Sequence, residues 1–280
     1  MKGRSFELLP LVRGVFEVMR ICQKIRRMSV SGDLENHETQ SAEDPVKDMS
    51  PVVLTERDIA VFQFIHEQRY VCYNQIKDGF WKERSPDANA CWHRVGKLVN
   101  AGYLTKEYSG KQGTDAYFAS KTAVEVLKTK FLDSGLGVAE PTPYFDRNIS
   151  HDLHVNNLRI LFREMGLYQW TSERILIERD HLFRRPDAVL TIRGRKVALE
   201  FENGLTKGRD RYRELFGYYD LSESYRFLFV IVRGDTRDWL VELDYDARKT
   251  WFVDYKKLIK EREKVLFANK RGEFELSRLL

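Results

Sequence analysis

Hydrophobic residues at helical spacing predict three helices at the start of the folded part of the chain, which we expect to begin near Pro51. Thr55 followed by Asp58 is a helix-start signal, and the apolar residues that follow it fall on one stripe. Further helices are expected over 73–81 and over 87–101, where Gly102 ends the third. The pattern then alternates with period two, which predicts a β-hairpin with strands over 103–108 and 116–118.

This order, three helices and a hairpin, is that of a winged helix-turn-helix. The third helix is expected to bury Ala88, Cys91, Trp92, Val95, Leu98 and Val99. Its other side chains are donors suited to phosphates and base edges, and they are Asn89, His93, Arg94, Lys97 and Asn100. Such a helix can lie in the major groove while the hairpin tip, here Lys111, reaches the phosphate backbone. The alternative is a protein-interaction module, because residues 51–119 carry nine basic against eight acidic residues.

A further amphipathic helix over 120–132, with Phe131 expected to face inward, precedes a Gly- and Pro-rich boundary over 135–143. Beyond it the pattern predicts an α/β domain with a mixed central sheet, so that the whole chain is α+β. The predicted domains are 51–143 and 144–280, after a leading segment over 1–50. The elements expected in the second domain are helices over 150–165, 207–221 and 255–266 and strands over 168–177, 185–192, 196–202, 226–232, 239–243 and 250–254.

Three carboxylates stand out in the predicted hairpin of the second domain. Strand alternation places Glu200 and Glu202 on one face, and Asp187 at the start of the neighbouring strand can approach them. Gathered carboxylates repel one another unless a cation compensates, so the cluster predicts a site for Mg²⁺ or Mn²⁺. Such an ion would activate water for phosphodiester hydrolysis. The alternative is a solvated face on which the glutamates pair with Arg195, Lys207 or Arg209.

Basic residues are densest around the same hairpin and the helix after it. They are Arg184, Arg185, Arg193, Arg195, Lys196, Lys207, Arg209, Arg211 and Arg213. Phosphates are their natural partner, and we expect salt-sensitive DNA contacts from residues such as Arg185, Arg209 and Arg213. A surface helix with ion pairs is an equal alternative, since residues 145–280 carry 27 basic against 23 acidic residues.

The predicted helix over 150–165 opens with two histidines three residues apart. A zinc site would need further ligands that the sequence does not identify, so a structural role is favoured for His151 and His154. His154 or Asn156 is a lesser candidate for lining a cleft. Glu164 is expected to be ordinary helix-surface charge, with a role as an additional acidic residue as the alternative.

The elements from Pro186-Asp187 through Glu200 to the strand over 226–232 resemble the PD-(D/E)xK nuclease superfamily. Together with the winged helix and the helix opening His151-Asp152-Leu153-His154-Val155-Asn156, the chain resembles the replication-relaxation family of plasmid and mobile-element proteins. The resemblance covers about residues 54–232. It implies that Asp187 and Glu200 are metal ligands and that a catalytic lysine stands two positions after Glu200, where this chain has Glu202.

That departure leaves three readings of the nuclease-like domain. Glu202 is a further metal ligand, or Lys207 supplies the ammonium group from a migrated position, or the fold has lost catalysis and survives as a platform. The resemblance therefore implies either a Mg²⁺-dependent hydrolase that processes DNA or a noncatalytic factor for replication, transfer or transcription. A replication or transfer protein of a mobile element is a further expected partner, and a homodimer is an open alternative.

Composition changes this picture little. The chain has a net charge of +5, and a basic amphipathic segment over 1–29 is balanced by an acidic linker over 30–50. The three cysteines, Cys22, Cys72 and Cys91, form no disulfide or zinc pattern, so a reducing cytoplasm is expected. No run of about 18 apolar residues predicts a membrane span. Without a Gly-rich phosphate loop or a nucleophile elbow, ATPase, dehydrogenase and acyl-transfer activities are excluded.

Overall fold

A computed structural model describes residues 52–81, 88–142, 145–179, 184–204, 208–234, 236–243 and 248–280. These residues belong to one compact unit that spans 49–280. The expected basic segment and acidic linker over 1–50 lie outside the described residues, and so does Lys207. None of the helices in the described part of the chain is long and apolar enough to cross a membrane.

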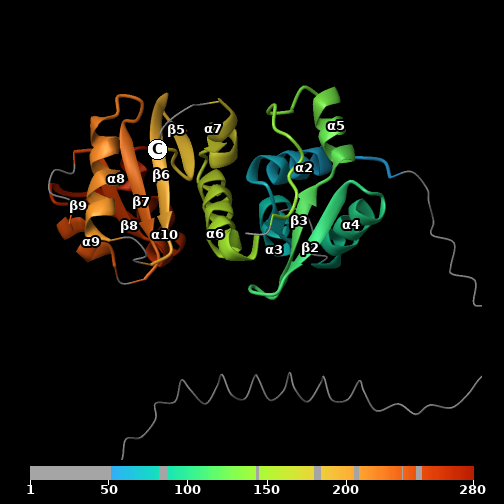
Figure 1. Ribbon diagram of the computed structural model, residues 1–280, viewed down its shortest axis with the longest axis horizontal. Helices are drawn as coiled ribbons and strands as arrows, with labels where there is room; N and C mark the ends of the chain where they lie inside the picture. The colour runs from blue at the N-terminus through green and yellow to red at the C-terminus, as the bar shows by residue number, and fades with distance from the viewer. Residues whose placement is uncertain are drawn as a thin grey trace, which may run out of the picture. The chain divides into compact units, whose positions relative to one another are not determined.

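Three helices and a hairpin form the first part of the described chain, as predicted (Figure 1). A short strand that the sequence did not predict, β1, lies between the first two helices and makes a sheet of order β1-β3-β2. The elements are α2 (Glu56–Gln68), β1 (Val71–Cys72), α3 (Tyr73–Phe80), α4 (Ala88–Asn100), β2 (Leu104–Ser109), β3 (Thr114–Ala119) and α5 (Lys121–Thr129).

The start of α2 has the cap that the sequence predicts. The Thr55 hydroxyl accepts a hydrogen bond from the Asp58 backbone N–H at 3.3 Å, and the Asp58 carboxylate accepts one from the Thr55 N–H at 2.7 Å. Ile59, Phe62 and Ile65 are then fully buried against α4 and α5. The capping box thus sets the residue at which α2 begins.

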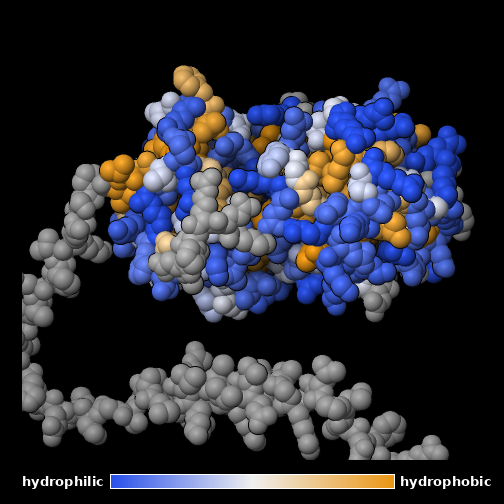
Figure 2. Space-filling view, turned by 180° about the vertical axis from the view of Figure 1, so that it is seen from behind, coloured by the Kyte–Doolittle hydropathy of each residue, from blue (hydrophilic) through white to orange (hydrophobic). Residues whose placement is uncertain are grey.

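Two aromatic residues expected to face inward are instead exposed. Trp92 is 56% exposed, because the buried stripe of α4 runs through Cys91, Val95 and Leu98 and Trp92 lies about 100° away from Cys91. Phe131 is 95% exposed, because α5 ends at Thr129 and the helical period no longer applies. Figure 2 shows hydrophobic residues at the surface in this part of the molecule.

The second part of the described chain is a mixed seven-stranded sheet of order β10-β9-β8-β7-β6-β5-β4. The pairs β6–β7 and β7–β8 are parallel and the others are antiparallel. The structure is therefore α+β with a mixed sheet, as predicted. The strands are β4 (Trp170–Ser172), β5 (Ala188–Ile192), β6 (Arg195–Glu202), β7 (Phe227–Val232), β8 (Thr250–Asp254), β9 (Leu266–Asn269) and β10 (Gly272–Glu275).

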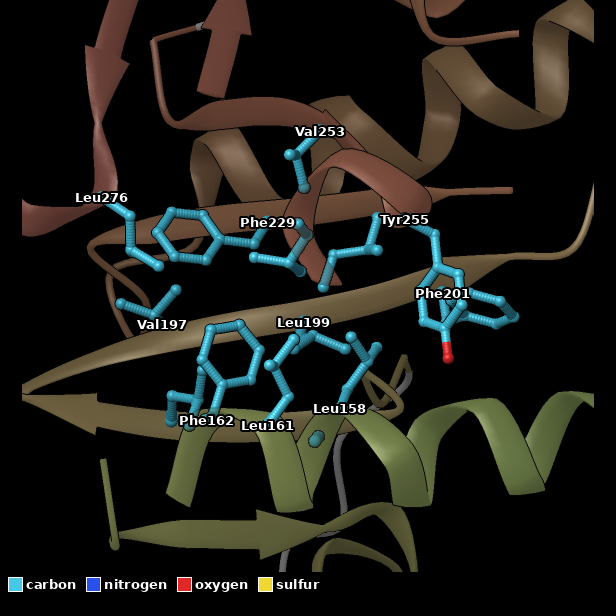
Figure 3. Packing of buried hydrophobic residues seen from close by; sticks show 14 of the residues in the cluster. Leu158, Leu161, Phe162, Val197, Leu199, Phe201, Phe229, Val253, Tyr255 and Leu276 are labelled. Carbon is cyan, nitrogen blue, oxygen red and sulfur yellow. The ribbon is translucent and has the colours of Figure 1, made fainter. Parts of the chain in front are cut away.

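Helices cover both faces of this sheet. Figure 3 shows Leu158, Leu161 and Phe162 of α6 (Phe145–Glu164) packed against Val197 and Leu199 of β6. The opposite face packs against α8 (Arg209–Leu221) through a cluster that includes Ala198, Tyr212, Phe216, Tyr219 and Val230. Successive residues of β6 therefore enter two different cores, as strand alternation requires.

Three predicted elements of the second part are wrong in type or length. The strand expected over 168–177 is β4 followed by the helix α7 (Glu173–Arg179), and the strand expected over 239–243 is the helix α9 (Arg237–Leu243). In α9 the buried residues Leu240 and Leu243 are three apart, and so short an apolar run does not distinguish a helix from a strand. The last helix, α10 (Tyr255–Glu261), ends early, and the hairpin β9–β10 follows.

Candidate functional site

Glu200 and Glu202 project from β6 toward α8, on the same face as predicted. This face is not solvated, because the two residues are only 8% and 3% exposed, whereas the pairing with Lys207 that the alternative included lies outside the described residues. The Tyr219 hydroxyl donates to Glu200 Oε1 at 2.9 Å, and the Tyr212 hydroxyl donates to Glu202 Oε2 at 3.1 Å. Buried carboxylates need such donors, because a buried charge without hydrogen bonds is costly. Tyr212 and Tyr219 lie seven residues apart, which is two turns of α8, and each binds one of the two glutamates.

Tyr219 is itself fully buried. Burial raises the pKa of its hydroxyl, and the charge of the adjacent Glu200 carboxylate raises it further. Tyr219 therefore stays protonated and remains a donor to Glu200 over the whole physiological range. The sequence carried a signal for this contact, since Tyr212 and Tyr219 fall on the core-facing stripe of the predicted helix over 207–221.

Asp187 lies beside Glu200 in the sheet, because Ala188 pairs with Leu199 across the β5–β6 ladder. Asp187 Oδ2 accepts a hydrogen bond from the Phe201 backbone N–H at 2.7 Å, and His151 Nε2 of α6 lies 3.2 Å from the same oxygen. The carboxylate is thus held by β6 and by α6, on the opposite side of the sheet from the tyrosines that hold Glu200.

His151 lies between two carboxylates, since its Nδ1 is 3.2 Å from Asp152 Oδ1. Burial by itself would lower the pKa of His151, but the hydrogen bonds with Asp152 and Asp187 outweigh it and raise the pKa to about 11. The imidazole is therefore a cation at neutral pH. It compensates the charge of Asp187, the residue predicted to bind a divalent metal.

A cavity of about 40 Å³ opens beside this histidine. Four segments contribute charged residues to its lining: the end of α2, α6, α7 and the start of β5. These residues are Glu67, Arg69, His151, Asp152, Glu173, Arg174 and Asp187. Burial and the nearby Asp187 raise the pKa of Glu173. Asn156 lines the cavity, as one interpretation of the sequence proposed, whereas His154 stacks on Phe201 with ring centroids 5.0 Å apart.

Glu200 faces a different pocket, of about 200 Å³. Arginines surround the glutamate there, and the lining residues are Arg184, Arg185, Glu200, Arg211 and Leu215. Asp187 and Glu200, the two metal ligands that the resemblance implies, thus line separate pockets. Among the residues that the structure describes, no group of three or more His, Cys, Asp or Glu side chains is arranged to hold a metal ion.

The other predicted DNA-contacting residues of the second part are exposed on or near α8. Arg209 lies over the ring of Trp239, with its Cζ 5.7 Å from the ring centroid. Arg213 Nη1 is 3.4 Å from Asp210 Oδ1 on the same helix, and Arg184 Nη2 is 3.1 Å from Glu214 Oε2. Exposed pairs of this kind contribute little to stability, so their arginines can exchange a carboxylate for a phosphate at small cost. Glu164, by contrast, forms an ion pair with Arg262.

The exposed face of α4 is a continuous stripe at helical spacing. It consists of Asn89, Trp92, His93, Gly96, Lys97 and Asn100, and it contains no acidic residue. Arg94, predicted to contact DNA, lies off this stripe. Its Nε donates to Asp58 Oδ1 at 2.9 Å and its Nη2 to the Val53 carbonyl at 2.8 Å. Arg94 therefore joins α4 to the start of α2 instead of facing solvent.

Lys111 is exposed at the tip of the β2–β3 hairpin, as predicted. The turn is closed by the Gly113 N–H, which donates to the Ser109 carbonyl at 2.8 Å. The Ser109 hydroxyl in turn donates to Asp146 Oδ1 of α6 at 2.6 Å. α6 thus contacts the hairpin directly beside its turn, and Lys111 lies within that turn.

Comparisons with known proteins add no relative. No protein-family model, no curated protein and no solved structure matches the chain.

Proposed function

We propose that this protein binds double-stranded DNA, with α2, α3, α4 and the three-stranded sheet acting as a winged helix-turn-helix. The observation that carries the proposal is the exposed stripe of α4, which presents His93 and Lys97 and no acidic side chain. A helix of this length fits the major groove, and its lack of carboxylates avoids repulsion by the phosphates. Lys111 at the hairpin tip is placed to reach the backbone beside the groove.

The second part serves, in this proposal, as a phosphate-binding platform with the topology of a PD-(D/E)xK nuclease domain. The pocket formed by Arg184, Arg185 and Arg211 supports this role, because guanidinium groups bind phosphate oxygens in bidentate geometry. The order of α6, β4, β5, β6, α8 and β7 supports the resemblance to the superfamily, with the helix α7 inserted between β4 and β5.

Cleavage is not part of the proposed function, because the carboxylates do not fit a metal site. Glu200 and Glu202 accept hydrogen bonds from tyrosines, and Asp187 is neutralised by His151. The position two residues after Glu200 holds a glutamate where the superfamily has a lysine. Each carboxylate thus already binds a hydrogen-bond donor or a cation of the protein through an oxygen that a metal ion would need as a ligand.

Metal-dependent DNA cleavage is the second candidate, and one observation favours it. Glu200 lines the arginine pocket, so a phosphodiester held by the arginines would lie close to a carboxylate. Plasmid cleavage by the full chain in Mg²⁺ or Mn²⁺ decides between the two candidates. We expect intact plasmid and no heat of metal binding by calorimetry. Cleavage that is lost in Glu200→Gln, with the fold retained, would establish the nuclease instead.

Binding of a fluorescent DNA duplex to the full chain tests the main proposal. We expect binding that depends on salt. The double variant Lys97→Ala/Lys111→Ala should bind every DNA sequence more weakly. Its slope of log K against log [salt] should be smaller in magnitude by about two. The matched control removes two exposed lysines elsewhere, Lys121→Ala with Lys264→Ala, and should change affinity less than twofold. Absence of binding by the unaltered chain even at low salt would contradict the proposal and favour a protein-interaction module.

A further inference from the structure

Trp92 is the largest exposed apolar side chain on the α4 stripe. Its ring centroid lies 5.3 Å from that of Tyr73 in α3, and the two ring planes make an angle of 80°. This contact restrains the indole while 56% of the residue stays exposed. More than half of Trp92 is therefore available to another molecule, on the same face of α4 as Lys97.

Gly96 lies one turn further along the same stripe. A Cβ atom added to Gly96 would meet no other atom within 4 Å, so packing does not require glycine at this position. Glycine in the middle of a helix is destabilising relative to alanine. The stripe thus has a projecting indole next to a position where another molecule can approach the helix backbone closely.

The polar residues around Trp92 indicate which kind of molecule this surface can bind. Lys97 places a positive charge on the same stripe, His93 adds a hydrogen-bonding ring, and α4 contains no acidic residue. This surface is complementary to a polyanion that also offers an apolar group. Within the major groove, the apolar group of DNA is the C5 methyl of thymine.

We propose that Trp92 contacts thymine methyl groups in the major groove, so that α4 selects sites containing A·T pairs at the positions under the indole. The inference rests on the proposed function, since it assigns the specificity of the same DNA-binding helix. Lys97 and Lys111 contact phosphates and place the helix, and Trp92 discriminates between base pairs. Gly96 lets the helix come close enough for the indole to reach the methyl group.

The test starts with selection of preferred duplexes from a random pool by the full chain. Thymines in the selected site are then replaced one at a time by deoxyuridine, which lacks only the methyl group. We expect a replacement under the indole to weaken binding about three- to fivefold, in line with the transfer of one methyl group. Trp92→Ala should bind the thymine and deoxyuridine duplexes equally, while its urea unfolding transition remains cooperative.

Tyr168→Ala provides the matched control, because Tyr168 is another exposed aromatic residue, at 73%, outside α4. This variant should keep the preference for thymine. Equal binding of both duplexes by the unaltered chain would overturn the inference and leave salt-dependent DNA binding intact. A preference for single-stranded DNA that Trp92→Ala removes would also overturn it, in favour of stacking on unpaired bases. Absence of any duplex binding would remove both the inference and the proposed function.

Discussion

At the scale of single residues, the candidate site is governed by how each buried carboxylate finds its hydrogen-bond donors. Glu200 accepts from Tyr219, Glu202 accepts from Tyr212, and Asp187 accepts from the Phe201 N–H and lies against His151. These donors come from α8 on one side of the sheet and from β6 and α6 on the other. Each of the three carboxylates therefore has a hydrogen-bond donor of its own.

Replacing Tyr219 by phenylalanine tests this view of Glu200. Tyr219→Phe keeps the ring in the core and removes only the hydroxyl, so the buried carboxylate loses a donor. We expect a loss of about 1–3 kcal/mol in the free energy of unfolding, measured by urea denaturation. Tyr218→Phe is the control, because the Tyr218 hydroxyl makes only a 3.4 Å contact with the Arg184 carbonyl, and it should cost less. Equal stability of Tyr219→Phe and the unaltered chain would contradict the role of this hydrogen bond.

His151 makes stability depend on pH in a defined direction. Its pKa is raised from 6.5 in the unfolded chain to about 11 in the folded one. A raised histidine pKa stabilises the fold fully below about pH 6.5, and the contribution declines as the pH rises toward 11. The difference in unfolding free energy between the unaltered chain and His151→Gln should therefore shrink between pH 7 and pH 10. A difference that is constant over this range would show that His151 is uncharged.

At the scale of elements, the end of α5 is closed by a residue, Phe131, whose side chain is unfavourable for the backbone conformation found there. Phe131 follows the helix with φ at 57°, while the Leu132 N–H donates to the Leu127 carbonyl at 3.0 Å and the Phe131 N–H to the Lys128 carbonyl. This pattern caps the helix with a residue in the left-handed region, where glycine is favoured and a bulky side chain is strained.

Phe131→Gly should relieve this strain. Because Phe131 is 95% exposed, the substitution removes almost no packing. We expect the free energy of unfolding to rise by about 0.5–1 kcal/mol after allowing for the greater flexibility of glycine in the unfolded chain. Lys130→Gly is the control, since φ is −97° at that position and glycine brings no relief there. A less stable Phe131→Gly variant would mean that the exposed ring contributes contacts of its own.

At the scale of the whole unit, α6 joins the two sheets. On one side it packs on β6, and on the other its polar residues bind the segment around β1. Asn156, which is 1% exposed, donates to the Tyr70 carbonyl at 2.8 Å, and the Gln75 side chain donates to the Leu153 carbonyl at 2.6 Å. Arg159 and Glu67 add a largely buried ion pair between α6 and α2.

This coupling predicts that residues 49–280 unfold together. We expect urea transitions followed by tryptophan fluorescence and by far-ultraviolet circular dichroism to coincide. Asn156→Ala leaves the buried Tyr70 carbonyl without this donor and should lower stability by about 1–3 kcal/mol while the two transitions still coincide. As a control, Asn100→Ala on the exposed stripe of α4 should change stability by less than about 0.5 kcal/mol. Separate transitions for the two probes would show that the two sheets unfold independently.

Local patterns in the sequence determined the helices α2, α3, α4 and α8, the hairpin of β5 and β6, and the face shared by Glu200 and Glu202. Periodicity and capping depend on residues close together in the chain, so they can be read without knowledge of the fold. Short apolar runs such as that in α9 did not carry enough periods to be assigned.

Only the tertiary structure decided what surrounds the candidate residues. It buried Glu200 and Glu202 under α8, brought His151 to Asp187, separated Asp187 and Glu200 into two pockets, and turned Arg94 toward Asp58 and Trp92 toward solvent. These outcomes depend on packing between segments that are distant in sequence, and a side chain's charge state follows from the partners it meets there. The carboxylate pattern was therefore readable from the chain, whereas its chemistry was set by the fold.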